Sequence, residues 1–128
     1  MHLDYTGVRV RALAPSLRFF ERALGLRVVR RGTMDHGGRW VLLEDPTSHQ
    51  RLELNWYPRG NRFATPFERG ESLDHLGFRV QDLRAATRRV EKAGAVKVAQ
   101  VPARGRPEVV FLEGPDGIWI ELNQSPGD

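Results

Sequence analysis

The sequence predicts the α+β class, with two tandem βαβββ modules that form a curved mixed sheet around a cleft. The first observation is a matched pair of segments, Leu52-Glu53-Leu54-Asn55 and Ile120-Glu121-Leu122-Asn123. The second is an upstream pair, Asp4-Tyr5-Thr6-Gly7-Val8-Arg9-Val10 and Asp74-His75-Leu76-Gly77-Phe78-Arg79-Val80. Because an internal repeat reports one supersecondary unit used more than once, both halves of the chain are expected to contain the same elements.

The first module is predicted to cover residues 4–56. Short apolar or alternating runs between turn signals indicate its strands. These strands are expected at residues 4–11, 26–32, 39–44 and 50–56. A helix is expected to begin near Pro15, which suits a first turn, and to end at Gly25. Its apolar positions at helical spacing are Leu17, Phe20, Ala23 and Leu24.

The second module is predicted to cover residues 74–123. Asp82 is a good N-cap for a helix that runs through Ala93 and ends at Gly94. Strands are expected at residues 75–80, 95–101, 108–112 and 118–122. The irregular segment 57–73 is expected to be either a linker between the modules or a lid. Since one repeat would be marginally stable alone, residues 1–128 are predicted to form a single domain.

Composition excludes several classes of protein. The chain has 128 residues, a formal net charge of +4 and no cysteine, which rules out disulfides and a cysteine nucleophile. No apolar run is long enough for a membrane span, and residues 1–4 do not begin a signal peptide. Arginines are scattered rather than gathered into a stripe, so no nucleic-acid partner is predicted. A cytoplasmic protein without membrane contact is expected.

The strand pattern places several polar side chains on one face. Side chains alternate across a strand, so Tyr5 and His75 take equivalent positions in the two repeats, as do Glu53 and Glu121. A carboxylate within an apolar strand is costly unless it is paired, binds a metal or takes part in chemistry. Imidazole and carboxylate groups are suitable ligands for a divalent metal.

Each of these residues also has a purely structural explanation. His75 alone would suit a buried histidine of the core, and either glutamate alone would suit an ion pair with a nearby arginine. The recurrence of all of them on one face favours a metal site over these separate explanations.

The chain resembles the vicinal oxygen chelate superfamily. The resemblance is carried by the βαβββ repeat, the His75–Val80 strand, the Gly-Pro-Asp-Gly turn at 114–117 and the two Glu-Leu-Asn strands. This superfamily includes glyoxalase I (lactoylglutathione lyase), methylmalonyl-CoA epimerase, extradiol dioxygenases and metal-free antibiotic-binding proteins. The resemblance covers nearly the whole chain.

The resemblance to glyoxalase I implies a metal site on the first and fourth strands of each module. It assigns Glu53, His75 and Glu121 as ligands of a divalent metal ion, with zinc or nickel as first candidates and manganese, cobalt or iron as further ones. Tyr5 stands where the family usually has histidine or glutamine. We therefore expect Tyr5 to donate a hydrogen bond to the substrate. The resemblance also implies substrate contacts for Arg9 and Asn55.

The activity implied is that of a metal-dependent lyase or isomerase on an α-hydroxycarbonyl or hemithioacetal-type small molecule, with a thiol adduct as one candidate substrate. Glu121 and Glu53 would be the catalytic residues, moving a proton through a metal-stabilised enediolate. Relatives commonly complete the cleft from two chains, so a homodimer is expected. The main alternative is a metal-free, bleomycin resistance-like protein that binds a drug or metabolite. An extradiol dioxygenase is a second alternative, against which Tyr5 counts because one of its histidine ligands would be missing.

Overall fold

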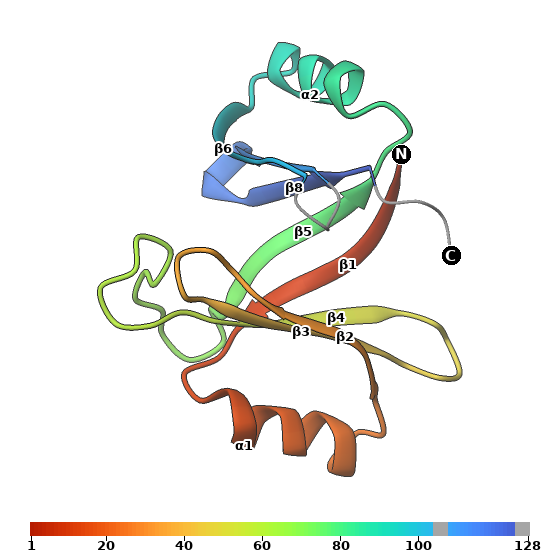
Figure 1. Ribbon diagram of the computed structural model, residues 1–128, viewed down its shortest axis with the longest axis vertical. Coiled ribbons are helices and arrows are strands. Elements are labelled where there is room, and N and C mark those ends of the chain that lie inside the picture. Colours follow the sequence, from red (N-terminus) through yellow and green to blue (C-terminus); the bar gives the residue numbers. More distant parts are fainter. Residues whose placement is uncertain (104–107, 125–128) are drawn as a thin grey trace. The chain divides into compact units, whose positions relative to one another are not determined.

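The computed structural model describes residues 1–103 and 108–124, and the predicted range 1–128 extends beyond this described part. Figure 1 shows the elements in chain order. The strands are β1 (His2–Arg9), β2 (Arg27–Thr33), β3 (Arg39–Glu44), β4 (Arg51–Trp56), β5 (Leu73–Arg79), β6 (Val96–Val101), β7 (Val109–Glu113) and β8 (Trp119–Asn123). The helical segments are α1 (Leu13–Arg18), η1 (Phe19–Ala23), α2 (Leu83–Lys92) and η2 (Pro115–Gly117). The order βαβββ therefore occurs twice, as the repeat predicts.

The chain divides into two compact units. We call Thr6–Asp74 the N-terminal unit, and Met1–Tyr5 together with His75–Asp128 the C-terminal unit. The division falls within strands β1 and β5, so the first five residues of the chain belong with the second repeat. The predicted modules 4–56 and 74–123 differ from these units at β1 and remain a prediction.

Each unit contains four strands with the same pairing pattern. The N-terminal unit has the order β2-β3-β4-β1, in which β1 and β4 are parallel and the other pairs are antiparallel. The C-terminal unit has the order β6-β7-β8-β5, in which β5 and β8 are parallel. Strand β2 has an irregular register between Val28 and Arg30, and β6 has one between Lys97 and Ala99. A mixed four-stranded sheet with a covering helix in each unit confirms the α+β class.

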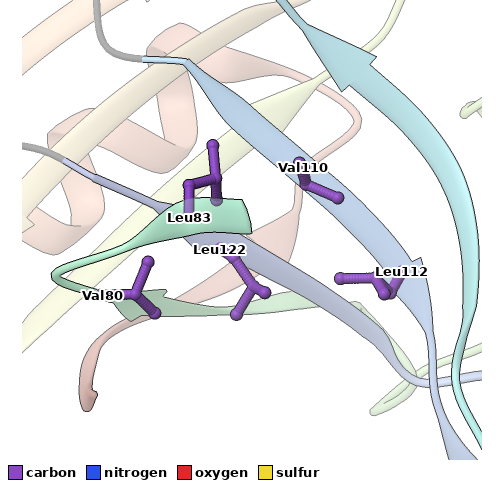
Figure 2. Packing of buried hydrophobic residues seen from close by; sticks show 5 residues of the cluster. All are labelled: Val80, Leu83, Val110, Leu112 and Leu122. Carbon is purple, nitrogen blue, oxygen red and sulfur yellow. The ribbon is translucent and has the colours of Figure 1, made fainter. Parts of the chain in front are cut away.

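One face of each four-stranded sheet packs against the helix of its own unit. In the N-terminal unit the buried residues are Val41, Leu43 and Leu54. The matching cluster of the C-terminal unit is Val80, Leu83, Val110, Leu112 and Leu122, whose side chains Figure 2 shows close together. Because neighbouring side chains point to opposite faces, burial of Leu54 and Leu122 against helices directs the adjacent Glu and Asn residues to the other face.

The two helices differ in regularity. In α2 the side chain of Asp82 accepts a hydrogen bond from the backbone N–H of Ala85 at 3.0 Å, which confirms the predicted N-cap. The first helix changes to π-helical η1 at Phe19, so its expected 3.6-residue spacing does not continue. Leu17 and Phe20 pack on the core as expected, but Leu24 is 54% exposed, which corrects its predicted burial.

Candidate functional site

The most closely connected polar group lies in the C-terminal unit and contains Tyr5, His75 and Glu121. The Tyr5 hydroxyl is 2.8 Å from Nε2 of His75, and the two rings meet edge to face with centroids 5.2 Å apart. Oε2 of Glu121 lies 3.7 Å from the same nitrogen atom. His75 is only 2% exposed and Tyr5 only 7%. Two oxygen atoms from different strands therefore approach one buried imidazole nitrogen.

The neighbouring residues hold this group in place. Glu121 pairs with Gly77 on β5 and with Phe111 on β7. The Phe111 ring contacts the His75 ring with centroids 5.7 Å apart and an interplanar angle of 76°. The Tyr5 ring lies directly over Gly77, where a Cβ atom would come within 2.6 Å of its Cζ atom. Glycine at position 77 thus provides the space that the Tyr5 ring occupies.

Each glutamate is held by the asparagine two residues further along its strand. Asn123 donates through Nδ2 to Oε1 of Glu121 at 3.3 Å. In the N-terminal unit, Asn55 donates through Nδ2 to Oε1 of Glu53 at 2.8 Å. Glu53 is 8% exposed and Asn55 is fully buried. The Glu-Leu-Asn motif therefore makes the same local structure in both repeats.

The donor chemistry of the C-terminal group fits a metal ion. Two neighbouring donors of one ion are about 3.0–3.4 Å apart when each bond is about 2.1 Å long. The spacings of 2.8 and 3.7 Å around Nε2 of His75 lie close to this range. Glu53, the third predicted ligand, belongs to the N-terminal unit. Within residues 1–103 and 108–124, no three His, Asp or Glu side chains are gathered to hold a metal.

Arg9, a predicted substrate contact, anchors the irregular segment 57–73 in the N-terminal unit. Its Nε atom lies 3.1 Å from Oδ1 of the buried Asp74. Its Nη1 atom donates to the carbonyl oxygen of Thr65 at 2.9 Å and also to the hydroxyl of that residue. Tyr57 donates its hydroxyl proton to Oδ2 of Asp74 at 2.9 Å. The start of the segment is thus joined to the buried Asp74 directly, and its middle is joined to Asp74 through Arg9.

The arginine–aspartate contact also recurs. In the C-terminal unit, Nη2 of Arg79 lies 3.6 Å from Oδ2 of Asp4, and these residues are the repeat equivalents of Arg9 and Asp74.

Burial raises the pKa of Tyr57, and the adjacent Asp74 carboxylate raises that pKa further through its charge and its hydrogen bond.

Sequence reasoning missed three residues of these networks. Asp74 and Tyr57 were not singled out, although Asp74 immediately precedes His75 in the repeat. Phe111 was not singled out either, because it is an ordinary apolar residue of an expected strand. Only its register opposite Glu121 reveals the contact with His75. For Asp74, the equivalence with Asp4 was a signal that could have been used.

Comparisons with known proteins agree with this fold. The family model described as glyoxalase/bleomycin resistance protein/dioxygenase superfamily matches residues 2–122. Lactoylglutathione lyase of Neisseria meningitidis serogroup A is 31% identical over 131 residues, covering 97% of this chain and 91% of that protein. A hypothetical protein of Bacillus halodurans superposes with a TM-score of 0.81 at 21% identity, over 99% of this chain and 96% of that one. Methylmalonyl-CoA epimerase of Mycobacterium tuberculosis superposes with a TM-score of 0.73 at 25% identity, covering 98% and 88%.

The fold and the repeated strand motifs define a protein of paired βαβββ units. The chain belongs to the glyoxalase/bleomycin resistance protein/dioxygenase superfamily. The family resemblance drawn from the sequence is thereby confirmed. No helix in the described part of the chain is both long and apolar enough to cross a membrane.

Replacement of Gly77 by alanine should disturb the Tyr5 ring. The added Cβ would overlap this buried side chain, and overpacking of this kind costs about 1–3 kcal/mol of unfolding free energy. Gly114→Ala is the matched control, because its Cβ would have its nearest neighbour at an ordinary 3.5 Å. Urea unfolding of both variants measures the difference. Equal losses of stability would show that Tyr5 does not need the space at position 77.

The raised pKa of Tyr57 predicts a loss of stability in alkaline solution. The folded protein keeps the phenolic proton at a pH where the unfolded chain, with a pKa of about 10, has lost it. This contribution is complete below about pH 10 and declines as the pH rises toward the folded-state pKa. Tyr57→Phe should therefore lose less unfolding free energy than the wild type between about pH 9 and pH 11. Denaturant unfolding at several pH values measures this, and parallel curves would contradict the assignment.

Proposed function

We propose that this protein is a metal-dependent lyase or isomerase similar to glyoxalase I, acting on an α-hydroxycarbonyl or hemithioacetal-type small molecule. The observation that supports it most is the approach of a Glu121 oxygen to Nε2 of His75 in a chain of this family. The 31% identity to a lactoylglutathione lyase over most of both chains supports the same class of reaction.

His75 and Glu121 would hold the metal, with Glu53 as the further ligand that the family resemblance implies. A bound divalent cation would supply a Lewis acid that polarises two adjacent substrate oxygens and stabilises the charge of an enediolate. Zinc and nickel are the first candidates, and manganese, cobalt and iron are the others. Imidazole and carboxylate donors are compatible with all of these ions.

Glu121 is proposed to act as the base. Its Oε1 atom is held by Asn123, and its side chain is 13% exposed, so the carboxylate is oriented but not fully enclosed. Glu121, leaving or flanking the metal, would take the proton from the carbon next to the carbonyl and return it to the neighbouring carbon. Glu53, held in the same way by Asn55, is the candidate for proton transfer on the opposite face of the substrate.

Substrate contacts are proposed for Asn55 and Arg9. Among the described residues, the buried Oδ1 atom of Asn55 accepts no hydrogen bond, and such an atom gains free energy when a ligand supplies a donor. Arg9 would contact a substrate carboxylate only while it also anchors segment 57–73, because its guanidinium is bonded to that segment. We also propose that the protein is a homodimer in the cytoplasm.

Epimerisation next to a thioester carbonyl is the second candidate activity. The similarity to methylmalonyl-CoA epimerase at 25% identity favours it. This reaction would use the same residues, since it also removes and returns a proton beside a carbonyl group. A metal-free protein that binds a drug or metabolite remains the non-enzymatic alternative.

Replacement of Glu121 by glutamine should remove the base while keeping the shape of the side chain. Turnover of a methylglyoxal and glutathione mixture should fall by a factor of about 10²–10⁴, the usual contribution of a positioned base. Glu113→Gln is the control, because this exposed glutamate lies on the neighbouring strand β7. The measurement is the rate of hemithioacetal consumption, with methylmalonyl-CoA as the parallel substrate.

Three results can be distinguished. Loss of hemithioacetal turnover in Glu121→Gln alone supports the lyase. Turnover of the CoA ester alone, lost in the same variant, selects the epimerase. An unimpaired Glu121→Gln variant contradicts the proposed role of Glu121 in either reaction.

A further inference from the structure

A hollow of about 400 Å³ lies in the C-terminal unit, lined by side chains of helix α2 and of strands β6 and β7. This volume is within the range of small-molecule sites. The buried residues Leu83, Thr87 and Val110 form its floor, and two of them, Leu83 and Val110, belong to the cluster labelled in Figure 2. The hollow therefore lies on the helix-covered face of the sheet, opposite the face that carries Glu121.

The lining of this hollow carries charges of both signs. The cationic side chains are Arg84, Arg88 and Lys97, and the anionic ones are Asp82, Glu91 and Glu108. A ligand with only negative charge would meet three carboxylates, and a ligand with only positive charge would meet three cations. Because like charges repel, this lining favours a ligand that carries one charge of each sign.

Three of the six charged side chains are held by local hydrogen bonds. Lys97 donates through Nζ to Oε1 of Gln100 at 3.2 Å, and Nε2 of Gln100 donates to Oε1 of Glu108. Asp82 accepts the backbone N–H of Ala85 as the N-cap of α2. These three charged groups already have partners within the protein.

The other three charged side chains, Arg84, Arg88 and Glu91, form one stripe along α2. They stand at positions i, i+4 and i+7, which share one side of a helix. All three are exposed, and among the described residues none of their side chains has a hydrogen bond or an ion pair. These are therefore the charged groups of the lining that are available to a ligand.

We propose that this hollow binds a zwitterion of the amino acid type, either a free α-amino acid or a short peptide. The ligand carboxylate lies between Arg84 and Arg88, since guanidinium groups bind planar carboxylates through paired N–H donors. The ligand ammonium group binds Glu91 in the last turn of α2. The helix dipole favours this orientation, because an anion is stabilised near the N-terminus and a cation near the C-terminus. None of the residues assigned to the proposed lyase site lines the hollow, so this inference does not depend on that function.

The test is isothermal titration calorimetry of the full-length protein with four probes. L-alanine and L-alanyl-L-alanine carry both charges, whereas propionate carries only the carboxylate and ethylamine only the ammonium group. At least one of the two zwitterions should bind saturably. Its affinity should exceed that of either single-charge probe about tenfold or more, because each of these probes lacks one charge-assisted contact. The tighter zwitterion shows whether the site takes a free amino acid or a peptide.

Substitutions on α2 locate the binding site. Arg84→Ala and Arg88→Ala should each weaken zwitterion binding about tenfold or more, and Glu91→Gln should bring it down to the affinity of propionate. Arg89→Ala is the matched control, because Arg89 is exposed on the same helix but does not line the hollow. Its affinity should equal that of the wild type, and circular dichroism monitors the fold of each variant.

Three results would overturn the proposal. The first is that neither zwitterion binds saturably, and the second is that propionate or ethylamine binds as tightly as the zwitterions. The third is zwitterion binding that persists unchanged in folded Arg84→Ala and Arg88→Ala. The first two results are obtained with the wild type, so they decide the matter even if a variant does not fold. Binding is measured without turnover, so the proposed lyase activity stands or falls separately.

Discussion

The approach of two oxygen atoms to Nε2 of His75 is the interaction on which the polar site depends. Placing a carboxylate and an imidazole in a nearly closed environment costs free energy unless each group finds a partner. Here the partners come from three strands, with Tyr5 on β1, His75 on β5 and Glu121 on β8. The parallel pairing of β5 with β8 sets the spacing between histidine and glutamate.

The repeat explains why both units carry the same supporting contacts while only one carries this polar group. Each unit has a Glu-Leu-Asn strand in which asparagine holds glutamate, and each has an arginine–aspartate pair. The first strand differs, because Tyr5 stands in one repeat where His75 stands in the other. This substitution brings a phenol into contact with the imidazole.

Much of this arrangement was predictable from the sequence because strand faces alternate with a fixed period. That period alone predicts that Leu122 points to the opposite face of the sheet from Glu121 and Asn123. The burial of Leu122 in the cluster of Figure 2 confirms this. The attachment of segment 57–73 was not predictable, since irregular backbone has no periodicity that would bring Tyr57 to Asp74. The π-helical turn at η1 was missed because apolar spacing does not report a change in helical hydrogen bonding.

Metal content tests most directly whether His75 and Glu121 form a metal centre. The measurement is mass spectrometry of metals in the purified, untagged protein, followed by thermal melts with zinc, nickel, manganese, cobalt and iron. We predict stoichiometric metal, or a rise in melting temperature with at least one ion, because a ligand that binds only the folded state stabilises it. Either signal should be lost in His75→Ala. A wild-type protein that contains no metal and is stabilised by none of these ions would contradict a metal centre.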